Sequence, residues 1–403
     1  MGSLQQHSTS PVSPISISAA AMGASDRPAI SNDHPLVINL DHGDPTMYEK
    51  FWKKAGDEAT LVISGWETMS YFSNKDNVCW FLERGFEEEV RRLHEFVGNA
   101  VVDGKHIIVG TGSTQLFQAA LFALSDPNSD QPANVVSSVP YYSVYPVATD
   151  YLKSRLYQWA GDVEKYQGEG SYIELVCSPN NPDGLSKQAV LSSENGKGKT
   201  IHDLAYYWPQ YTAITAAADH DIMLFTISKT TGHAGIRIGW ALVKDDEVAR
   251  KMIKFIEMNT IGVSKDSQIR AARILSVVRN SHDNSKIVHS VEESFFHYAR
   301  RTMTERWDRL NEAIKSSNGA FILADFPSQH CNFSDEIIES HPAFAWMKCE
   351  KEGIDDFYGF LKKHNILTRG GEHFGVEKKY VRISMLDRDP MFDIFINRMS
   401  IIH

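Results

Sequence analysis

A lysine that directly follows an apolar run is the residue in this sequence with the clearest chemical potential. Lys229 comes after Phe225-Thr226-Ile227-Ser228, and Arg237 stands eight residues further on, beyond a glycine-rich stretch. Burying an ammonium group is costly unless the charge is neutralised or used. Desolvation and nearby cations lower the pKa of an amine, which an imine-forming lysine requires. Most lysines after strands are solvated, so Lys229 needs the support of other residues.

A loop rich in glycine and hydroxyl side chains provides a second candidate, for binding an anion. The loop 110–115 reads Gly-Thr-Gly-Ser-Thr-Gln, follows an apolar run and precedes a segment with helical periodicity. Glycines between a strand and a helix let backbone N–H groups and the positive helix end face a phosphate. A dinucleotide-binding motif would need a third glycine where Gln115 stands, so that alternative is excluded. A tight turn with a helix cap is the structural alternative.

Polar residues also follow two further apolar runs. Ser178-Pro179-Asn180-Asn181-Pro182-Asp183-Gly184 comes after one run, and Asp203 and Tyr206 end the next. Ligands of open α/β sheets bind beyond the carboxyl ends of the strands, so these residues can meet Lys229 and the glycine loop in one crevice. An Asp can keep a pyridine nitrogen protonated, while Asn and Tyr can donate to a phenolate oxygen. An ordinary turn and a helix cap are the alternative roles.

Positioning these residues together requires a largely parallel sheet. Short apolar runs alternate with segments of helical periodicity from Pro35 onward, which predicts an α/β fold. Residues 86–97 carry Phe86, Val90, Leu93 and Val97 on one stripe and are predicted to form an amphipathic helix. The predicted strands of the central sheet are 106–110, 134–138, 172–177, 200–204, 221–227 and 238–243.

The pattern changes after about residue 245. Long charged helices are predicted through Asn318, followed by shorter strands at 321–325, 343–349 and 380–385. This change indicates a second, smaller domain that begins near residue 285. The first 33 residues are rich in Ser, Ala and Pro and lack Cys and aromatic residues, so we expect a disordered tail there.

The composition narrows the class of protein. The chain of 403 residues has 41 Lys and Arg against 51 Asp and Glu, a net charge of −10, which argues against a broad nucleic-acid-binding face. No run approaches the ~18–20 apolar residues that span a bilayer, so no membrane association is expected. Four widely separated cysteines suit free thiols in a reducing compartment and no metal site, and we expect a cytoplasmic location.

Six motifs in order give the sequence a family resemblance over about residues 36–395. It resembles the fold-type-I pyridoxal phosphate enzymes, specifically the alliinase-related branch that includes the plant tryptophan aminotransferases of auxin synthesis. The matching segments are 66–72, 112–116, 178–184, 202–209, 228–233 and 380–384. The chain departs from the family at Ile236, where a small hydroxyl residue is expected beside the phosphate.

The resemblance implies a fold and a domain division. We expect a fold-type-I aminotransferase with a mostly parallel seven-stranded sheet in its large domain and a smaller α+β C-terminal domain. After the tail at 1–33, residues 34–80 are expected to be shared by the small domain and the dimer contacts. The large cofactor-binding domain is expected at 81–285 and the small domain at 286–403.

The resemblance also assigns residues to pyridoxal 5′-phosphate. It implies that Lys229 forms the covalent link to the cofactor and that Asp203 pairs with the pyridinium nitrogen. Asn181 and Tyr206 would hold the ring oxygen, and Tyr142 would stack on the ring. The expected phosphate contacts are Gly112, Ser113, Thr114, Ser228 and Arg237, with Tyr71 supplied by the partner subunit of a homodimer.

Substrate contacts and the reaction follow from the same resemblance. Arg382 is expected to hold the substrate carboxylate, with contacts from Gly43 and Asn181. Lys229, Asp203 and Tyr206 are the expected catalytic residues. The expected reaction converts L-tryptophan and pyruvate to indole-3-pyruvate and L-alanine, the first step of auxin synthesis.

Three alternatives to this reaction stay open. They are a C–S lyase acting on S-alkyl-cysteine sulfoxides, an aminotransferase for other aromatic amino acids, and a non-catalytic relative that keeps the fold. The segment before Pro35 has no cysteine, whereas alliinases carry a Cys-rich module there. This difference favours the aminotransferase branch over the lyase branch.

Overall fold

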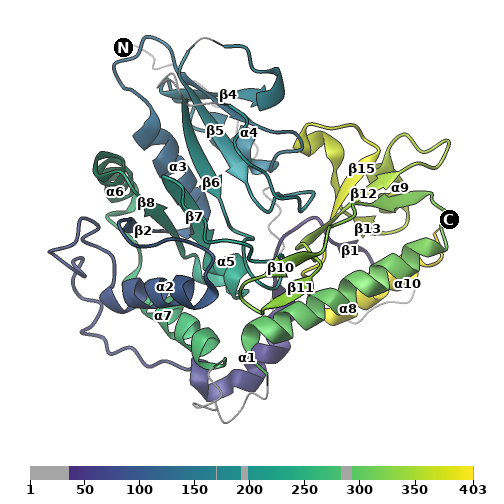
Figure 1. The fold of residues 1–403 in the computed structure, drawn as a ribbon, viewed down its shortest axis with the longest axis horizontal. Helices are drawn as coiled ribbons and strands as arrows, with labels where there is room; N and C mark the ends of the chain where they lie inside the picture. Colours follow the sequence, from purple (N-terminus) through teal and green to yellow (C-terminus); the bar gives the residue numbers. More distant parts are fainter. Residues whose placement is uncertain (1–35, 169, 192–197, 283–292, 403) are drawn as a thin grey trace, which may run out of the picture. The chain divides into compact units, whose positions relative to one another are not determined.

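A seven-stranded sheet is formed by strands between residues 106 and 243 (Figure 1). The structure is a computed structural model, and it describes residues 36–168, 170–191, 198–282 and 293–402. The strand order is β2-β8-β7-β6-β5-β3-β4. Six strands run in one direction, and β8 is antiparallel to both of its neighbours. The strands are β2 (His106–Gly110), β3 (Ala133–Ser137), β4 (Tyr157–Asp162), β5 (Tyr172–Cys177), β6 (Gly198–Asp203), β7 (Ile222–Thr226) and β8 (Gly239–Val243).

The six predicted apolar runs all become strands of this sheet, so the predicted α/β fold with a mostly parallel sheet is confirmed. The seventh strand, β4, was not identified from the sequence. It lies at the sheet edge, and beyond Tyr157 its residues are partly or fully exposed. Its pairing with β3 also shifts register after Val135. An edge strand that needs little burial lacks the apolar run by which the other strands were recognised.

Helices cover both faces of the sheet. A Cβ on Gly239 would lie 2.7 Å from the backbone nitrogen of Ser113, so the start of α3 (Gly112–Leu124) packs on that face. The next residue, Trp240, packs against Phe86 and His94 of α2 (Arg84–Val97). Since successive residues of a strand point to opposite faces, α3 and α2 lie on opposite sides. Helix α6 (Asp246–Thr260) packs on α3, and α7 (Lys265–Asn280) packs on α2.

Helix α2 forms as its sequence predicted. The stripe of Phe86, Val90, Leu93 and Val97 is buried, with each side chain at most 2% exposed. Its first turn is capped by the Glu83 carboxylate, which accepts a hydrogen bond from the backbone N–H of Phe86 at 2.7 Å. The helix ends at Gly98, which adopts a left-handed conformation.

The C-terminal part is built on a four-stranded antiparallel sheet of order β14-β15-β12-β9. The first described strand, β1, pairs in parallel with β13, so the beginning of the fold is held by residues near its end. A short hairpin, β10–β11, lies outside both of these sheets. The elements are β1 (Ile38–Asn39), α1 (Glu49–Ala55), α8 (Phe295–Lys315), β9 (Phe321–Leu323), β10 (Gln329–Cys331), β11 (Glu336–Ile338), β12 (Phe344–Cys349), α9 (Phe357–Lys363), β13 (Ile366–Leu367), β14 (Arg369–Gly370), β15 (Tyr380–Ser384) and α10 (Asp389–Met399). Helix α4 (Val144–Asp150) and the one-turn helix α5 (Ile227–Thr230) belong to the larger part.

The predicted division into domains stays a prediction. The described residues from Val37 onward belong to one compact unit. The predicted tail at 1–33 lies outside the described residues. None of the helices in the described ranges is long and apolar enough to cross a bilayer.

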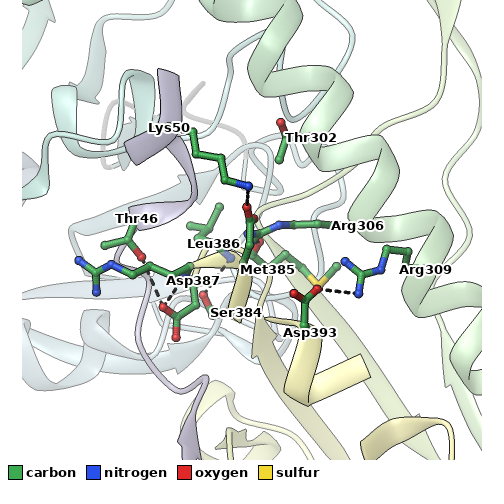
Figure 2. A network of polar contacts seen from close by, with 12 residues as sticks. Thr46, Lys50, Thr302, Arg306, Arg309, Ser384, Met385, Leu386, Asp387 and Asp393 are labelled. Carbon is green, nitrogen blue, oxygen red and sulfur yellow. Dashed lines mark hydrogen bonds and ion pairs between the residues drawn. The ribbon is translucent and has the colours of Figure 1, made fainter. Parts of the chain in front are cut away.

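A network of charged residues fastens α1 to α8 and α10 (Figure 2). Arg306 of α8 is 2% exposed and donates to the carbonyl of Met385 at 2.6 Å and to Asp389 at 2.7 Å. Lys50 of α1 pairs with the same carboxylate. One turn further along α8, Arg309 makes an exposed pair with Asp393 at 2.8 Å. The buried arginine therefore joins three segments that are distant in sequence.

The substitution Arg306→Ala is expected to lower the free energy of unfolding by about 1–3 kcal/mol, because it leaves the buried Met385 carbonyl without its donor. Urea denaturation of purified protein measures the loss. Arg309→Ala is the matched control, since Arg309 also lies over the ring of Phe392 but its ion pair is exposed. That control should lose roughly 0.2–1 kcal/mol. Equal losses in the two variants would contradict the role given to Arg306.

Candidate active site

The predicted cofactor residues gather at one edge of the central sheet. Gly112 follows β2, Asn181 follows β5, Asp203 ends β6 and Lys229 follows β7. These four strands run in the same direction, because β2 and β7 are both antiparallel to β8. Their carboxyl ends therefore lie at one edge of the sheet, and the structure places these four residues at that edge.

Lys229 is partly buried, and its amine points at the loop after β1. The Nζ atom donates a hydrogen bond to the carbonyl of Gly43, and it lies 6.0 Å from the centre of the Tyr206 ring. Burial and the charges of Arg382 and Arg237 lower the pKa of the amine from 10.5 to about 8, against the opposing effect of Asp44. A substantial fraction of this amine is therefore uncharged near neutral pH, as a nucleophilic lysine requires.

Arg382 of β15 is 3% exposed and lies against the ring of Phe344, 4.1 Å from its centre. It donates from Nη1 to the Asn181 side chain at 3.0 Å and from Nη2 to the carbonyl of Asp41 at 2.5 Å. Its Nε atom is buried and has no hydrogen-bond partner among the residues that the structure describes. Burial lowers the pKa of this guanidinium to about 10, so it stays charged at neutral pH. An unpaired donor on a buried cation is suited to an anionic ligand.

Asp203 is a partly buried carboxylate with no cationic partner among the described residues. It accepts a hydrogen bond from the Tyr145 hydroxyl at 3.0 Å and one from the backbone N–H of Ala205 at 3.2 Å. Burial raises its pKa above the ordinary value, and the hydrogen bond from Tyr145 opposes this effect. A protonated ring nitrogen beside it would supply the missing positive charge.

Three side chains predicted to contact the cofactor ring lie around this carboxylate and the lysine. Tyr142 packs edge-on against Tyr145, with ring centres 5.4 Å apart. The charge of Asp203 helps to raise the pKa of both phenols. Tyr206 is 7% exposed, and burial raises its pKa well above 10. Its hydroxyl therefore stays protonated and can donate. Asn181, 3% exposed, is held by Arg382.

The predicted phosphate contacts form a cradle around the start of α3. Gly112 has φ +75°, and a Cβ on it would lie 2.5 Å from Nη2 of Arg237, so only glycine allows this approach. Ser113 and Thr114 occupy the first turn of α3, where backbone N–H groups have no intrahelical acceptors. Arg237 donates to the Ala234 carbonyl at 2.8 Å and lies 3.5 Å from the Ser228 hydroxyl.

Tyr71 is the predicted residue that the single chain does not bring to the cleft. Its side chain is 71% exposed, and it lines a shallow hollow with Thr260 and Gly262. The role predicted for Tyr71 is at the site of a partner subunit.

Four residues of the site were not identified from the sequence. Tyr145 lies three residues after Tyr142, a spacing that places both on one side of a helical turn and could have indicated it. The other three, Asp41, Arg369 and Phe344, come from the small sheet and the segment after β1. Asp41 and Arg369 form an ion pair with Nε–Oδ1 at 2.5 Å, and Asp41 also accepts from Arg382. No local motif marks these three, because their contacts depend on strand register.

These residues fit pyridoxal phosphate. The cradle at Gly112 provides an anion site, Asp203 provides a carboxylate for a protonated ring nitrogen, and Lys229 provides a partly neutral amine. The unpaired Nε of Arg382 provides a donor for the carboxylate of a substrate. A phosphate, a basic ring nitrogen and an aldehyde are the three groups that this cofactor carries.

Comparisons with known proteins agree with this geometry. A family model described as "Allinase" matches residues 38–403. The chain is 58% identical over 381 residues to tryptophan aminotransferase-related protein 1 of Oryza sativa subsp. japonica, covering 94% of this chain and 85% of that protein. It is 35% identical over 360 residues to alliin lyase of Allium cepa var. aggregatum, covering 87% of this chain and 78% of the lyase.

A solved structure of similar fold supports the same assignment. The Escherichia coli protein YbdL, described as having a methionine aminotransferase function, superposes with a TM-score of 0.66 at 14% identity and covers 91% of this chain and 93% of its own. The likeness shows the fold, that of the type-I aminotransferases. The chain therefore belongs to the alliinase family of pyridoxal phosphate-dependent enzymes.

Proposed function

We propose that this chain is an aminotransferase that converts L-tryptophan and pyruvate to indole-3-pyruvate and L-alanine, the first step of auxin synthesis in a plant. The observation that carries the proposal is the placement of a partly neutral amine, Lys229, beside a buried guanidinium with an unpaired nitrogen, Arg382. The amine can remove a proton from the reacting carbon of an amino acid, and the guanidinium can bind the carboxylate of the same amino acid.

The division of labour among the residues follows from their surroundings. Bound pyridoxal phosphate supplies the electron sink that stabilises the carbanion. Lys229 removes the proton from the substrate Cα, which its lowered pKa allows near neutral pH. With the cofactor bound, Asp203 would keep the ring nitrogen protonated, and Tyr206 and Asn181 would donate to the ring oxygen. Arg382 fixes the carboxylate and so sets the direction of the Cα–H bond.

The choice of tryptophan rests on relatives. The chain shares far more residues with a protein named as tryptophan aminotransferase-related than with an alliin lyase. The lyase reaction uses the same carbanion to expel a β-substituent and is the second candidate. Tryptophan has no ready leaving group at Cβ, so the substrate alone can direct one site to either outcome.

A homodimer is part of the proposal. The segment 62–72 exposes several large apolar side chains, which a monomer would leave in water. They are Val62 at 88%, Trp66 at 73%, Met69 at 83%, Tyr71 at 71% and Phe72 at 50% exposure. Burial of this segment by a second copy would also deliver Tyr71 to the partner's phosphate cradle.

A cytoplasmic location is likewise proposed, consistent with four buried free thiols.

Lys229→Ala should abolish covalent attachment of pyridoxal phosphate. Native protein incubated with the coenzyme and reduced with borohydride should gain one equivalent at Lys229, located by peptide mass analysis. After a short, fixed reaction time, the fraction of labelled protein should increase as the pH is raised through about 8, because the amine reacts only when it is neutral.

Lys187→Ala is the matched control, because Lys187 is another partly buried lysine with a lowered pKa. This variant should still be labelled at Lys229. Attachment of the coenzyme to another residue in the native protein would reject the assigned role of Lys229.

Arg382→Ala should weaken binding of L-tryptophan by about 2–5 kcal/mol, because the substrate carboxylate loses a buried partner. Tryptamine, which lacks the carboxylate, should bind native and variant protein alike. Calorimetric titration of the coenzyme-loaded protein measures both ligands. Arg388→Ala, which removes an exposed arginine paired with Glu49, should change neither affinity. Equal weakening of both ligands would remove Arg382 from the carboxylate site.

A comparison of two substrates separates the aminotransferase from the lyase. With tryptophan and pyruvate, the coenzyme-loaded protein should form indole-3-pyruvate and alanine in equal amounts, as measured by chromatography. With an S-alkyl-cysteine sulfoxide and no keto acid, it should release little pyruvate and ammonia. Rapid release of both from the sulfoxide, without transamination of tryptophan, would establish the lyase in place of the aminotransferase.

A further inference from the structure

Two arginines face each other on neighbouring strands at the substrate side of the cleft. Arg369 of β14 and Arg382 of β15 are direct cross-strand partners, so their side chains emerge on the same face. Like charges in such a pair repel each other, and the charge of Arg369 contributes to the lowered pKa of Arg382. The arrangement therefore requires a nearby anion.

Asp41 supplies that anion and engages both arginines. Its carboxylate accepts from Arg369 at two nitrogens, Nε at 2.5 Å and Nη2 at 3.2 Å. One of its carboxylate oxygens lies 3.9 Å from Nη2 of Arg382, and its backbone carbonyl accepts from the same nitrogen at 2.5 Å. A bidentate contact with a carboxylate is the geometry that suits a guanidinium best.

Each of the three guanidinium nitrogens of Arg369 has a hydrogen-bond partner, whereas one nitrogen of Arg382 has none among the described residues. The third of these contacts of Arg369 runs from Nη1 to the hydroxyl of Ser143 at 2.9 Å. Ser143 follows Tyr142, the predicted ring-stacking residue, so Arg369 lies close to the cofactor side of the cleft. Arg382 keeps one buried nitrogen without a partner.

The three groups together carry a net charge of +1. A single substrate carboxylate neutralises this charge. A second carboxylate on the same substrate would meet Arg369, which Asp41 already binds. We propose that Asp41 restricts this site to amino acids and keto acids with a single carboxylate by occupying Arg369. The proposal rests on the function proposed above, which places the substrate carboxylate on Arg382. On this proposal glutamate, aspartate and 2-oxoglutarate are poor substrates, whereas pyruvate, the acceptor proposed above, has the single carboxylate that the site accepts.

Removal of the Asp41 charge should turn Arg369 into a second carboxylate site. The test uses Asp41→Asn in the coenzyme-loaded protein, titrated in a calorimeter with glutarate, which has two carboxylates, and with butyrate, which has one. The affinity for glutarate relative to butyrate should rise roughly ten- to a hundredfold, as expected for one new charged hydrogen-bonding pair. The ratio of kcat/KM for 2-oxoglutarate to that for pyruvate should rise in parallel.

Three further variants isolate the cause. Asp41→Asn combined with Arg369→Gln should return the glutarate preference to the native value. Glu372→Gln removes an acidic charge that lines the same hollow as Asp41 but pairs with Lys378, and it should leave the preference unchanged. Asp41→Ala is measured beside Asp41→Asn, and the melting temperature of each variant shows that it is folded.

The outcomes separate this proposal from the proposed function. Native protein that binds glutarate as tightly as butyrate, or folded Asp41 variants that keep the native preference, would overturn the role of Asp41. A shift in glutarate preference without transamination of tryptophan in the native protein would support that role, while the proposed reaction would fail.

Discussion

Confinement of positive charge within a partly dry cleft is the constraint on which this structure depends. The charges of Arg382 and Arg237 help to lower the pKa of Lys229, and burial makes the charges of Lys229 and Arg382 costly. The fold tolerates them because carbonyl oxygens of Gly43, Ala234 and Asp41 accept their hydrogen bonds. Neutral acceptors of this kind leave the positive charges of Lys229, Arg237 and Arg382 available to a phosphate and a carboxylate.

Residues that follow strands directly could be placed from the sequence. Asp203 and Lys229 stand at the ends of apolar runs, and the direction of parallel strands brings them together without further information. The helix at 86–97 was predictable for a similar reason, since its stripe repeats locally. The apolar runs also sufficed for six of the seven strands of the sheet.

Contacts set by distant register could not be predicted in this way. Asp41 meets Arg369 and Arg382 across more than three hundred residues, and their pairing depends on how β14 aligns with β15. The edge strand β4 carries too little buried surface to show in the apolar pattern. Tyr71 is a different case, because the place predicted for it is in another copy of the chain.

The pairing of β1 with β13 has a consequence for synthesis on the ribosome. Ile38 aligns with Ile366, so the loop that carries Asp41 and Gly43 gains its neighbouring strand only after nearly all of the polypeptide has emerged. The central sheet, formed from residues 106–243, has no such requirement and can assemble while translation continues. The residues of the phosphate cradle can therefore fold before the segment that carries Asp41 and Gly43 gains its partner strand.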